Sequence, residues 1–209
     1  MKNRNNNITE LVLILDRSGS MQGLEKDTIG GFNSMIEKQK RIDGKCYVST
    51  VLFDNESEVL HDRIDLADVP VMTDNEYYPR GCTALLDAVG GAIHHVETIH
   101  KYARREDVPG HTVFCITTDG MENASRRYNI KKVRKMIEAK KELDWEFIFI
   151  GANIDAISAA ADIGINEDRA VNYTASEKGT RSVFSAISDF ASAARCETPI
   201  GREWKKNIE

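Results

Sequence analysis

Features that define several common protein classes are scarce or missing in this 209-residue chain. No apolar run approaches the roughly 20 residues that a membrane-spanning helix needs, so we expect no membrane contact. Lysine and arginine (28 residues) do not exceed aspartate and glutamate (33 residues), and the formal net charge is -5. A nucleic-acid-binding face depends on an excess of basic residues, so we also expect no nucleic-acid partner.

Cysteine is scarce as well, and its spacing is uninformative. The four cysteines form no C-x-x-C pair, so the paired ligand spacing of a structural zinc site is missing. The first seven residues, MKNRNNN, are polar and contain no apolar signal core. These observations predict a cytoplasmic protein whose thiols are reduced.

Two kinds of apolar segment alternate along the chain. Short apolar runs such as VLILD, VFCITTD and EFIFIG predict strands at 8–15, 46–53, 57–66, 112–118, 145–150 and 168–173. Segments with an apolar period of 3.6 residues predict helices at 24–40, 83–104, 129–142, 153–162 and 176–195. Strands that are apolar at successive positions are typical of parallel sheets covered on both faces. The pattern predicts an α/β fold with a doubly wound, mostly parallel sheet, helices on both faces and one antiparallel edge strand.

The length of the chain suits one substantial domain. We expect this domain to cover residues 8–195, after a flexible N-terminal tail at 1–7. The segment 196–209, CETPIGREWKKNIE, contains a proline and a glycine and little periodicity. We therefore expect it to be a C-terminal tail that leaves the domain or lies along its surface.

Polar side chains follow two of the predicted central strands. Asp16 ends the first strand and is followed by Ser18 and Ser20, and Asp119 ends the strand VFCITT. Thr83 lies at the predicted start of the second helix. Ligands of open α/β sheets bind at the carboxyl ends of the strands, so we expect these five side chains to meet at one sheet edge. Their carboxylate and hydroxyl oxygens suit Mg²⁺, Mn²⁺ or Ca²⁺ better than zinc or copper.

The segments DRSGS, GCTALLD and ITTDGMEN resemble the von Willebrand factor A domain with a metal-ion-dependent adhesion site. The resemblance extends over nearly the whole chain in its order of strands and helices. It implies that the hydroxyls of Ser18, Ser20 and Thr83 contact a divalent ion, and that Asp16 and Asp119 hold it directly or through water. It also implies an open coordination position, which a Glu or Asp carboxylate of a partner protein fills.

The donor set and the loop positions extend this prediction. Three hydroxyls with two carboxylates favour Mg²⁺, and Mn²⁺ and Ca²⁺ are the alternatives. Loop position alone predicts a partner-binding rim around the ion, made of Arg17, Met21, Arg80, Glu122 and Asn123.

The resemblance implies a metal-dependent protein–protein interaction module without catalytic residues, as an adaptor or subunit of an intracellular assembly. Two alternatives remain open. A Mg²⁺-dependent, phosphatase-like hydrolase would use Asp16, but the D-x-D motif of haloacid-dehalogenase-type enzymes has a second acid where this chain has Ser18. A metal-free structural scaffold would use the aspartate and serines as helix caps.

Overall fold

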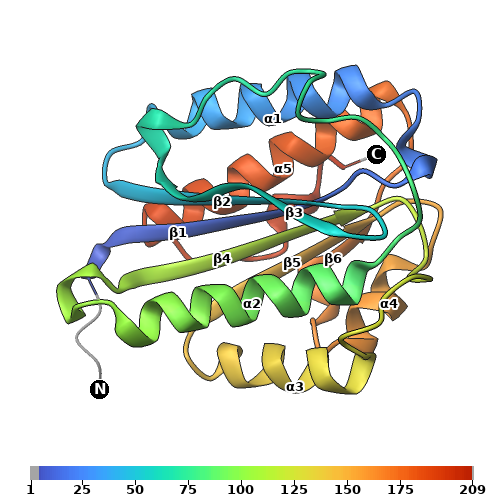
Figure 1. The fold of residues 1–209 in the computed structure, drawn as a ribbon. Helices are drawn as coiled ribbons and strands as arrows, with labels where there is room; N and C mark the ends of the chain where they lie inside the picture. The colour runs from blue at the N-terminus through green and yellow to red at the C-terminus, as the bar shows by residue number, and fades with distance from the viewer. Residues whose placement is uncertain (1–4, 209) are drawn as a thin grey trace.

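A six-stranded sheet in the order β3-β2-β1-β4-β5-β6 forms the centre of the protein (Figure 1). The structure is a computed structural model that describes residues 5–208. β2 and β3 pair antiparallel, and every other neighbouring pair of strands is parallel. This confirms the predicted sheet with one antiparallel edge strand. The strands are β1 (Asn5–Asp16), β2 (Lys45–Phe53), β3 (Ser57–Asp65), β4 (Pro109–Thr118), β5 (Trp145–Gly151) and β6 (Ala170–Asn172).

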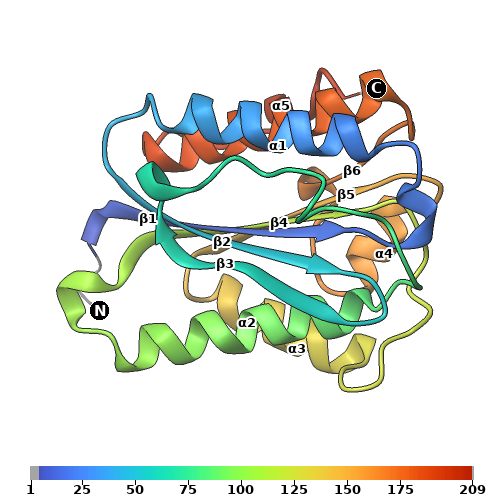
Figure 2. The same cartoon turned by 45° about the horizontal axis from the view of Figure 1, so that its top comes forward.

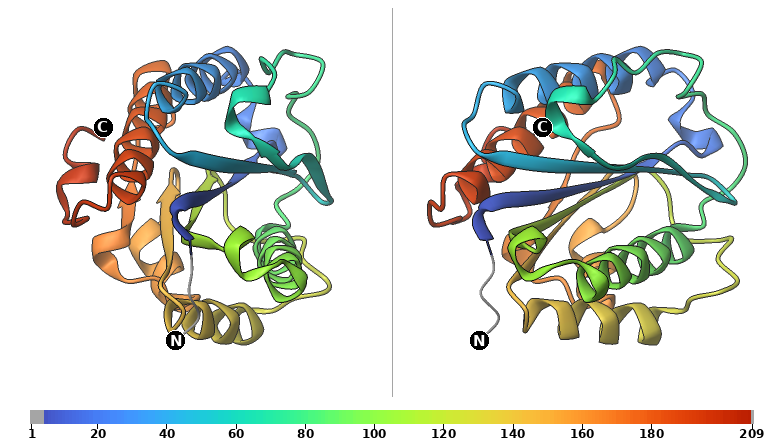
Figure 3. Two further views of the ribbon diagram at one scale, coloured as in Figure 1. Left: turned by 90° about the vertical axis from the view of Figure 1, so that its left-hand side faces the viewer. Right: turned by 60° about the vertical axis from the view of Figure 1, so that its left-hand side comes forward.

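Helices cover both faces of the sheet, as Figure 2 and the two turned views in Figure 3 show. α1 and α5 lie on one face, and α2, α3 and α4 lie on the other. The α-helices of the described residues are α1 (Glu25–Gln39), α2 (Leu85–Tyr102), α3 (Ile130–Lys141), α4 (Ala156–Asp162) and α5 (Glu177–Arg195). None of these helices combines the length and the apolar character needed to cross a membrane.

The run LVLIL in β1 contributes to both hydrophobic cores. Leu11, Leu13 and Leu15 belong to the core under α1 and α5, whereas Val12 and Ile14 belong to the core under α2, α3 and α4. Successive side chains of a strand point to opposite faces, so a central strand covered on both faces must be apolar at every position. Burial on both faces therefore places β1 in the middle of the sheet, and Asp16 lies at its carboxyl end.

Two element boundaries differ from the prediction in ways that bear on the site. β1 begins at Asn5, so residues 5–7 belong to the strand and not to a flexible tail, whereas residues 1–4 lie outside the described part. α2 begins at Leu85, so Thr83 lies in the loop before the helix. The backbone of that loop is tied to the end of β2, because the Ala84 N–H donates to the carbonyl of Asp54 (2.7 Å).

The C-terminal segment lies along the surface, which is one of its two predicted courses. The indole of Trp204 packs edge-on against Phe190 of α5, with ring centroids 5.5 Å apart. Its Nε1 donates to the carbonyl of Asp168 (3.1 Å). The Lys205 ammonium donates to the carbonyl of Ala170 in β6 (2.7 Å). The segment therefore ties α5 to the β6 edge of the sheet.

We expect Trp204→Ala to lower the free energy of unfolding by about 3 kcal/mol. The side chain is only 6% exposed, so its removal loses apolar contacts with α5 as well as one hydrogen bond. Urea denaturation followed by circular dichroism measures the change. Val71→Ala is the control, because Val71 is 70% exposed and should change stability by less than about 0.5 kcal/mol. Equal effects of the two substitutions would contradict the docking of this segment.

Candidate metal site

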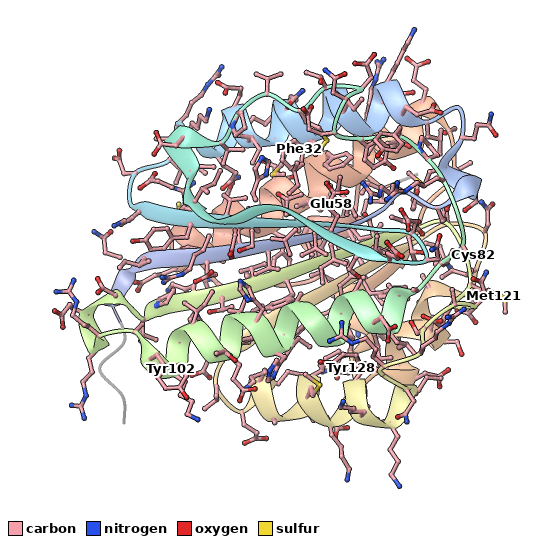
Figure 4. All side chains as sticks on the ribbon, viewed as in Figure 1. Phe32, Glu58, Cys82, Tyr102, Met121 and Tyr128 are labelled. Carbon is pink, nitrogen blue, oxygen red and sulfur yellow. The ribbon has the colours of Figure 1, made fainter. Side chains whose placement is uncertain are left out.

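The predicted ligands gather at the carboxyl ends of the parallel strands. Asp16 is the last residue of β1, and Asp119 directly follows β4, which pairs with β1 in parallel. Figure 4 places Cys82, the neighbour of Thr83, and Met121 at this end of the sheet, whereas Tyr102 lies at the opposite end.

Hydrogen bonds connect four of the five predicted ligands, which come from β1, the loop after it and the end of β4. The hydroxyl of Ser20 donates to Oδ1 of Asp119 (2.5 Å). The hydroxyls of Ser18 and Ser20 are 3.0 Å apart, and the backbone N–H of Ser18 donates to Oδ1 of Asp16 (2.7 Å). Residues 99 positions apart in the chain are thus in direct contact. The two hydroxyls at alternate positions of D-x-S-x-S lie on one side of the loop.

Thr83 lies beside the same group, next to Gly120. A Cβ atom added to Gly120 would lie 3.3 Å from Oγ1 of Thr83 and 3.5 Å from Oγ of Ser20. Both hydroxyls therefore flank the same glycine. The backbone N–H of Thr83 donates to the side-chain carbonyl of Asn123 (3.0 Å), which holds the threonine loop against the loop after β4.

The two carboxylates are buried close together. Burial raises the pKa of Asp16, against hydrogen bonds from Thr118 and Ser18 that lower it. Burial also raises the pKa of Asp119; the Ser20 hydrogen bond lowers it, and the nearby charge of Asp16 raises it further. Oδ2 of Asp119 is buried without a hydrogen-bond partner among the described residues. Two desolvated carboxylates and an unpaired carboxylate oxygen fit a cation, because its charge would offset the cost of their burial.

The type of donor narrows the kind of ion. Residues 5–208 contain no group of three or more His, Cys, Asp or Glu side chains that could hold a metal. An ion at this edge would therefore depend on the hydroxyls of Ser18, Ser20 and Thr83 as well as on the two carboxylates. An all-oxygen set of this kind suits Mg²⁺, Mn²⁺ or Ca²⁺.

We expect Gly120→Ala to weaken divalent-metal binding while leaving the fold stable. The new methyl group would lie in tight contact with the Thr83 hydroxyl and in contact with the Ser20 hydroxyl, and would displace the threonine, one of the proposed ligands. Isothermal titration calorimetry with MnCl₂ measures the affinity, and urea denaturation measures stability. Gly91→Ala in α2 is the control, because a Cβ at that position meets nothing within 4 Å. Unchanged affinity in Gly120→Ala would argue against an ion between these hydroxyls.

The structure corrects part of the predicted rim. Arg17 and Met21 are buried, so neither side chain is available to a partner at the surface. The Arg17 guanidinium turns inward because Asp54 and Glu58 lie 2.9 and 2.7 Å away. Arg80 is 46% exposed and lies near the site. Its role in partner binding stays a prediction.

Glu122 and Asn123 take part in hydrogen bonds that build the loops around the site. One carboxylate oxygen of Glu122 accepts from the N–H of Leu86 in the first turn of α2 (2.9 Å). The other accepts from the N–H groups of Ala124 and Ser125 (3.0 and 2.8 Å). Glu122 thus caps α2 from a different loop, because the first N–H groups of a helix lack partners within the helix.

Two residues that hold Asp16 in place escaped prediction. The Thr118 hydroxyl donates to Oδ2 of Asp16 (2.6 Å), and the hydroxyl of the fully buried Tyr77 donates to the Asp16 carbonyl (2.5 Å). The only sequence signal for the role of Thr118 was weak: it is a hydroxyl residue at the end of the largely apolar strand VFCITT. No sequence signal marks Tyr77, which lies in a segment without regular periodicity.

No protein-family model matches the chain, and no curated protein sequence matches it either. Solved structures do. The von Willebrand factor domain of the type V pilus tip protein Mfa5 from Porphyromonas gingivalis has a TM-score of 0.67 at 12% identity, over 92% of this chain and 97% of that one. A von Willebrand factor type A protein from Catenulispora acidiphila has a TM-score of 0.59 at 12% identity, over 90% of this chain and 42% of that one.

A third similar structure is proximal thread matrix protein 1 of the mussel byssus with a zinc-occupied MIDAS motif. Its TM-score is 0.60 at 15% identity, over 90% of this chain and 47% of that one. The chain thus spans about half the length of the mussel proteins it matches. Similarity at this level of identity establishes architecture, and it agrees with the sheet order and helix layers described above. The protein therefore has the fold of a von Willebrand factor A domain.

Proposed function

We propose that this protein is a divalent-metal-dependent protein–protein interaction module. The observation that carries the proposal is the convergence of five oxygen-bearing side chains at one sheet edge, with a buried carboxylate oxygen that lacks a partner. The mussel structure supports it, since zinc occupies a MIDAS motif on the same fold. The side chains in question are Asp16, Ser18, Ser20, Thr83 and Asp119.

The ligands assigned to the ion explain how a partner would be bound. Ser18, Ser20 and Thr83 would contribute uncharged hydroxyls, and Asp16 and Asp119 would contribute the two negative charges. The two negative charges of the carboxylates neutralise a divalent ion without exceeding its charge. The bound ion would therefore still attract a further anionic oxygen. A Glu or Asp of the partner would supply it, in a charge-assisted contact within a partly desolvated site. We propose Mg²⁺ as the ion, with Mn²⁺ and Ca²⁺ as alternatives.

We assign no catalytic residue to this site. A phosphatase of the D-x-D class would need Asp16 as a free nucleophile, whereas both of its carboxylate oxygens accept hydrogen bonds and the side chain is buried. Ser18 also lacks the acidity that the second position of that motif requires. In our proposal the protein is an adaptor or subunit of an intracellular assembly.

A pull-down from a lysate of the source cell tests the proposal, with wild type and Asp119→Asn as baits in Mg²⁺ and in EDTA. We expect a partner that is retained by the wild type with Mg²⁺ and lost in the other three conditions. Asp62→Asn is the matched control, since Asp62 is an exposed carboxylate on β3, and it should retain the partner.

The same proteins distinguish the alternatives. Equal capture with Mg²⁺ and EDTA, together with no measurable affinity for Mg²⁺ at millimolar concentrations, would favour a metal-free scaffold. Hydrolysis of p-nitrophenyl phosphate by the wild type that is lost in Asp16→Ala would favour a phosphatase. Either result would overturn the interaction-module proposal.

A further inference from the structure

Asp54 is a buried carboxylate beside the candidate metal site that the proposed ligand set does not include. It directly follows β2 and is 1% exposed. Its Oδ2 accepts from Nε of Arg17 (2.9 Å) and from Nε of Arg80 (2.8 Å). Its Oδ1 accepts from the N–H of Glu56 (2.9 Å). One carboxylate thus joins two arginines from separate parts of the chain.

Those arginines belong to the two loops that supply all three hydroxyl ligands. Arg17 lies between Asp16 and Ser18, and Arg80 lies three residues before Thr83. The backbones of the same loops are also connected: the Arg80 N–H donates to the Arg17 carbonyl (2.8 Å). The side-chain bridge through Asp54 therefore adds to a short backbone contact between the loops.

Further backbone bonds extend the connection towards the ligands. The N–H of Gly19 donates to the Gly81 carbonyl (3.2 Å), and the N–H of Ala84 donates to the Asp54 carbonyl (2.7 Å). Gly81 has a φ of +68°, and a Cβ there would lie 2.1 Å from Oδ1 of Asn55. The Gly19–Gly81 bond therefore joins the two loops at the residue between Ser18 and Ser20 and two residues before Thr83, and both loops approach the residues that follow β2.

Two carboxylates, Asp54 and Glu58, lie beside the two guanidinium groups of the bridge. Burial alone would raise the pKa of Asp54, but hydrogen bonds from Arg80, the Glu56 N–H and Arg17 outweigh it and hold the pKa below its ordinary value. Arg17 is also 1% exposed, and its other carboxylate partner is Glu58 (2.7 Å). A buried guanidinium needs such partners to offset the loss of hydration.

We propose that Asp54 is a positioning residue of the candidate metal site, because its carboxylate holds the Ser18–Ser20 segment and the Thr83 segment at the separation that lets their hydroxyls face one ion. This inference rests on the proposed function. Asp54 would act through Arg17 and Arg80 and would not touch the ion itself. Mutation of a residue that orients metal ligands without touching the metal commonly lowers metal affinity by about 10- to 100-fold.

Isothermal titration calorimetry with MnCl₂ as the only ligand tests the inference on the full chain. We expect Asp54→Asn to weaken Mn²⁺ binding by about tenfold or more, and Arg80→Gln to weaken it in the same direction. Asp62→Asn, which alters an exposed carboxylate paired with His95, should bind within about twofold of the wild type. Urea denaturation in EDTA establishes the folded fraction of each variant, since a purely structural role would lower stability without changing the affinity of the folded protein.

Each outcome decides a different question. A wild type that binds no Mn²⁺, Mg²⁺ or Ca²⁺ would overturn the proposed function and this inference with it. A wild type that binds Mn²⁺, with Asp54→Asn and Arg80→Gln both within about twofold of it, would overturn the inference alone. If Asp54→Asn does not fold, Arg80→Gln decides the matter, because it alters a side chain that is 46% exposed.

Discussion

Asp119→Asn is expected to abolish stabilisation by Mg²⁺ while leaving the metal-free protein at least as stable as the wild type. The asparagine keeps an acceptor for the Ser20 hydroxyl, which Asp119 binds at 2.5 Å. It removes a carboxylate whose pKa is raised by burial, lowered by the Ser20 hydrogen bond and raised further by the charge of Asp16. Without an ion that charge disfavours the fold, so its loss should not destabilise the protein.

The metal-dependent part of the effect is large. A ligand present at about 100 times its Kd stabilises the folded state by about 2.7 kcal/mol, and this increment should disappear in the variant. Urea denaturation in EDTA measures the stability of the metal-free protein, and the same experiment in saturating MgCl₂ measures the increment due to Mg²⁺. Asp62→Asn should keep the increment. A variant that remains stabilised by Mg²⁺, or that loses more than about 1 kcal/mol in EDTA, would count against Asp119 as a functional ligand.

Glu10→Ala should have the reverse outcome, with a loss of about 3–5 kcal/mol in stability and no change in metal affinity. The Glu10 side chain is fully buried in the middle of β1, six residues before Asp16. Its Oε2 accepts from Nε of Arg63 (2.9 Å) and lies 3.0 Å from Nε2 of His100. Removal of the carboxylate would leave a largely buried guanidinium without its charged partner, which is the costly way to break a buried pair.

Distance is the reason for unchanged metal binding in this variant. Six residues of strand separate positions 10 and 16, or about 20 Å at roughly 3.3 Å per residue. Urea denaturation and calorimetry with MnCl₂ measure the two quantities. Glu10→Gln, which keeps an acceptor oxygen, should lose less stability than Glu10→Ala. A tenfold fall in Mn²⁺ affinity in Glu10→Ala would show that the middle of β1 is coupled to the candidate metal site.

Local patterns account for the elements that could be predicted. Apolar runs located the six strands of the sheet, and an apolar period of 3.6 residues located the five α-helices that cover it. A strand covered on both faces must be apolar at successive positions, and a helix that covers a sheet must be apolar along one face. D-x-S-x-S placed Asp16, Ser18 and Ser20 together, since their separation is short enough for the local backbone to decide it. The prediction that Asp119 and Thr83 would join them followed from a general property of parallel sheets.

The directions of the remaining side chains depended on contacts that are distant in sequence. Arg17 was predicted to be a rim residue, yet it turns inward towards Asp54, 37 positions away. Asp16 is held by Thr118 across 102 positions and by Tyr77 across 61.

The order of elements, the two-sided burial of the sheet and the residue types at the carboxyl ends of its strands all follow from local sequence patterns. Contacts between distant segments, which appear only in the folded protein, select which of those side chains meet and which support them from behind. A loop side chain has several rotamers of similar local energy, and a hydrogen bond or ion pair to a distant segment favours one of them.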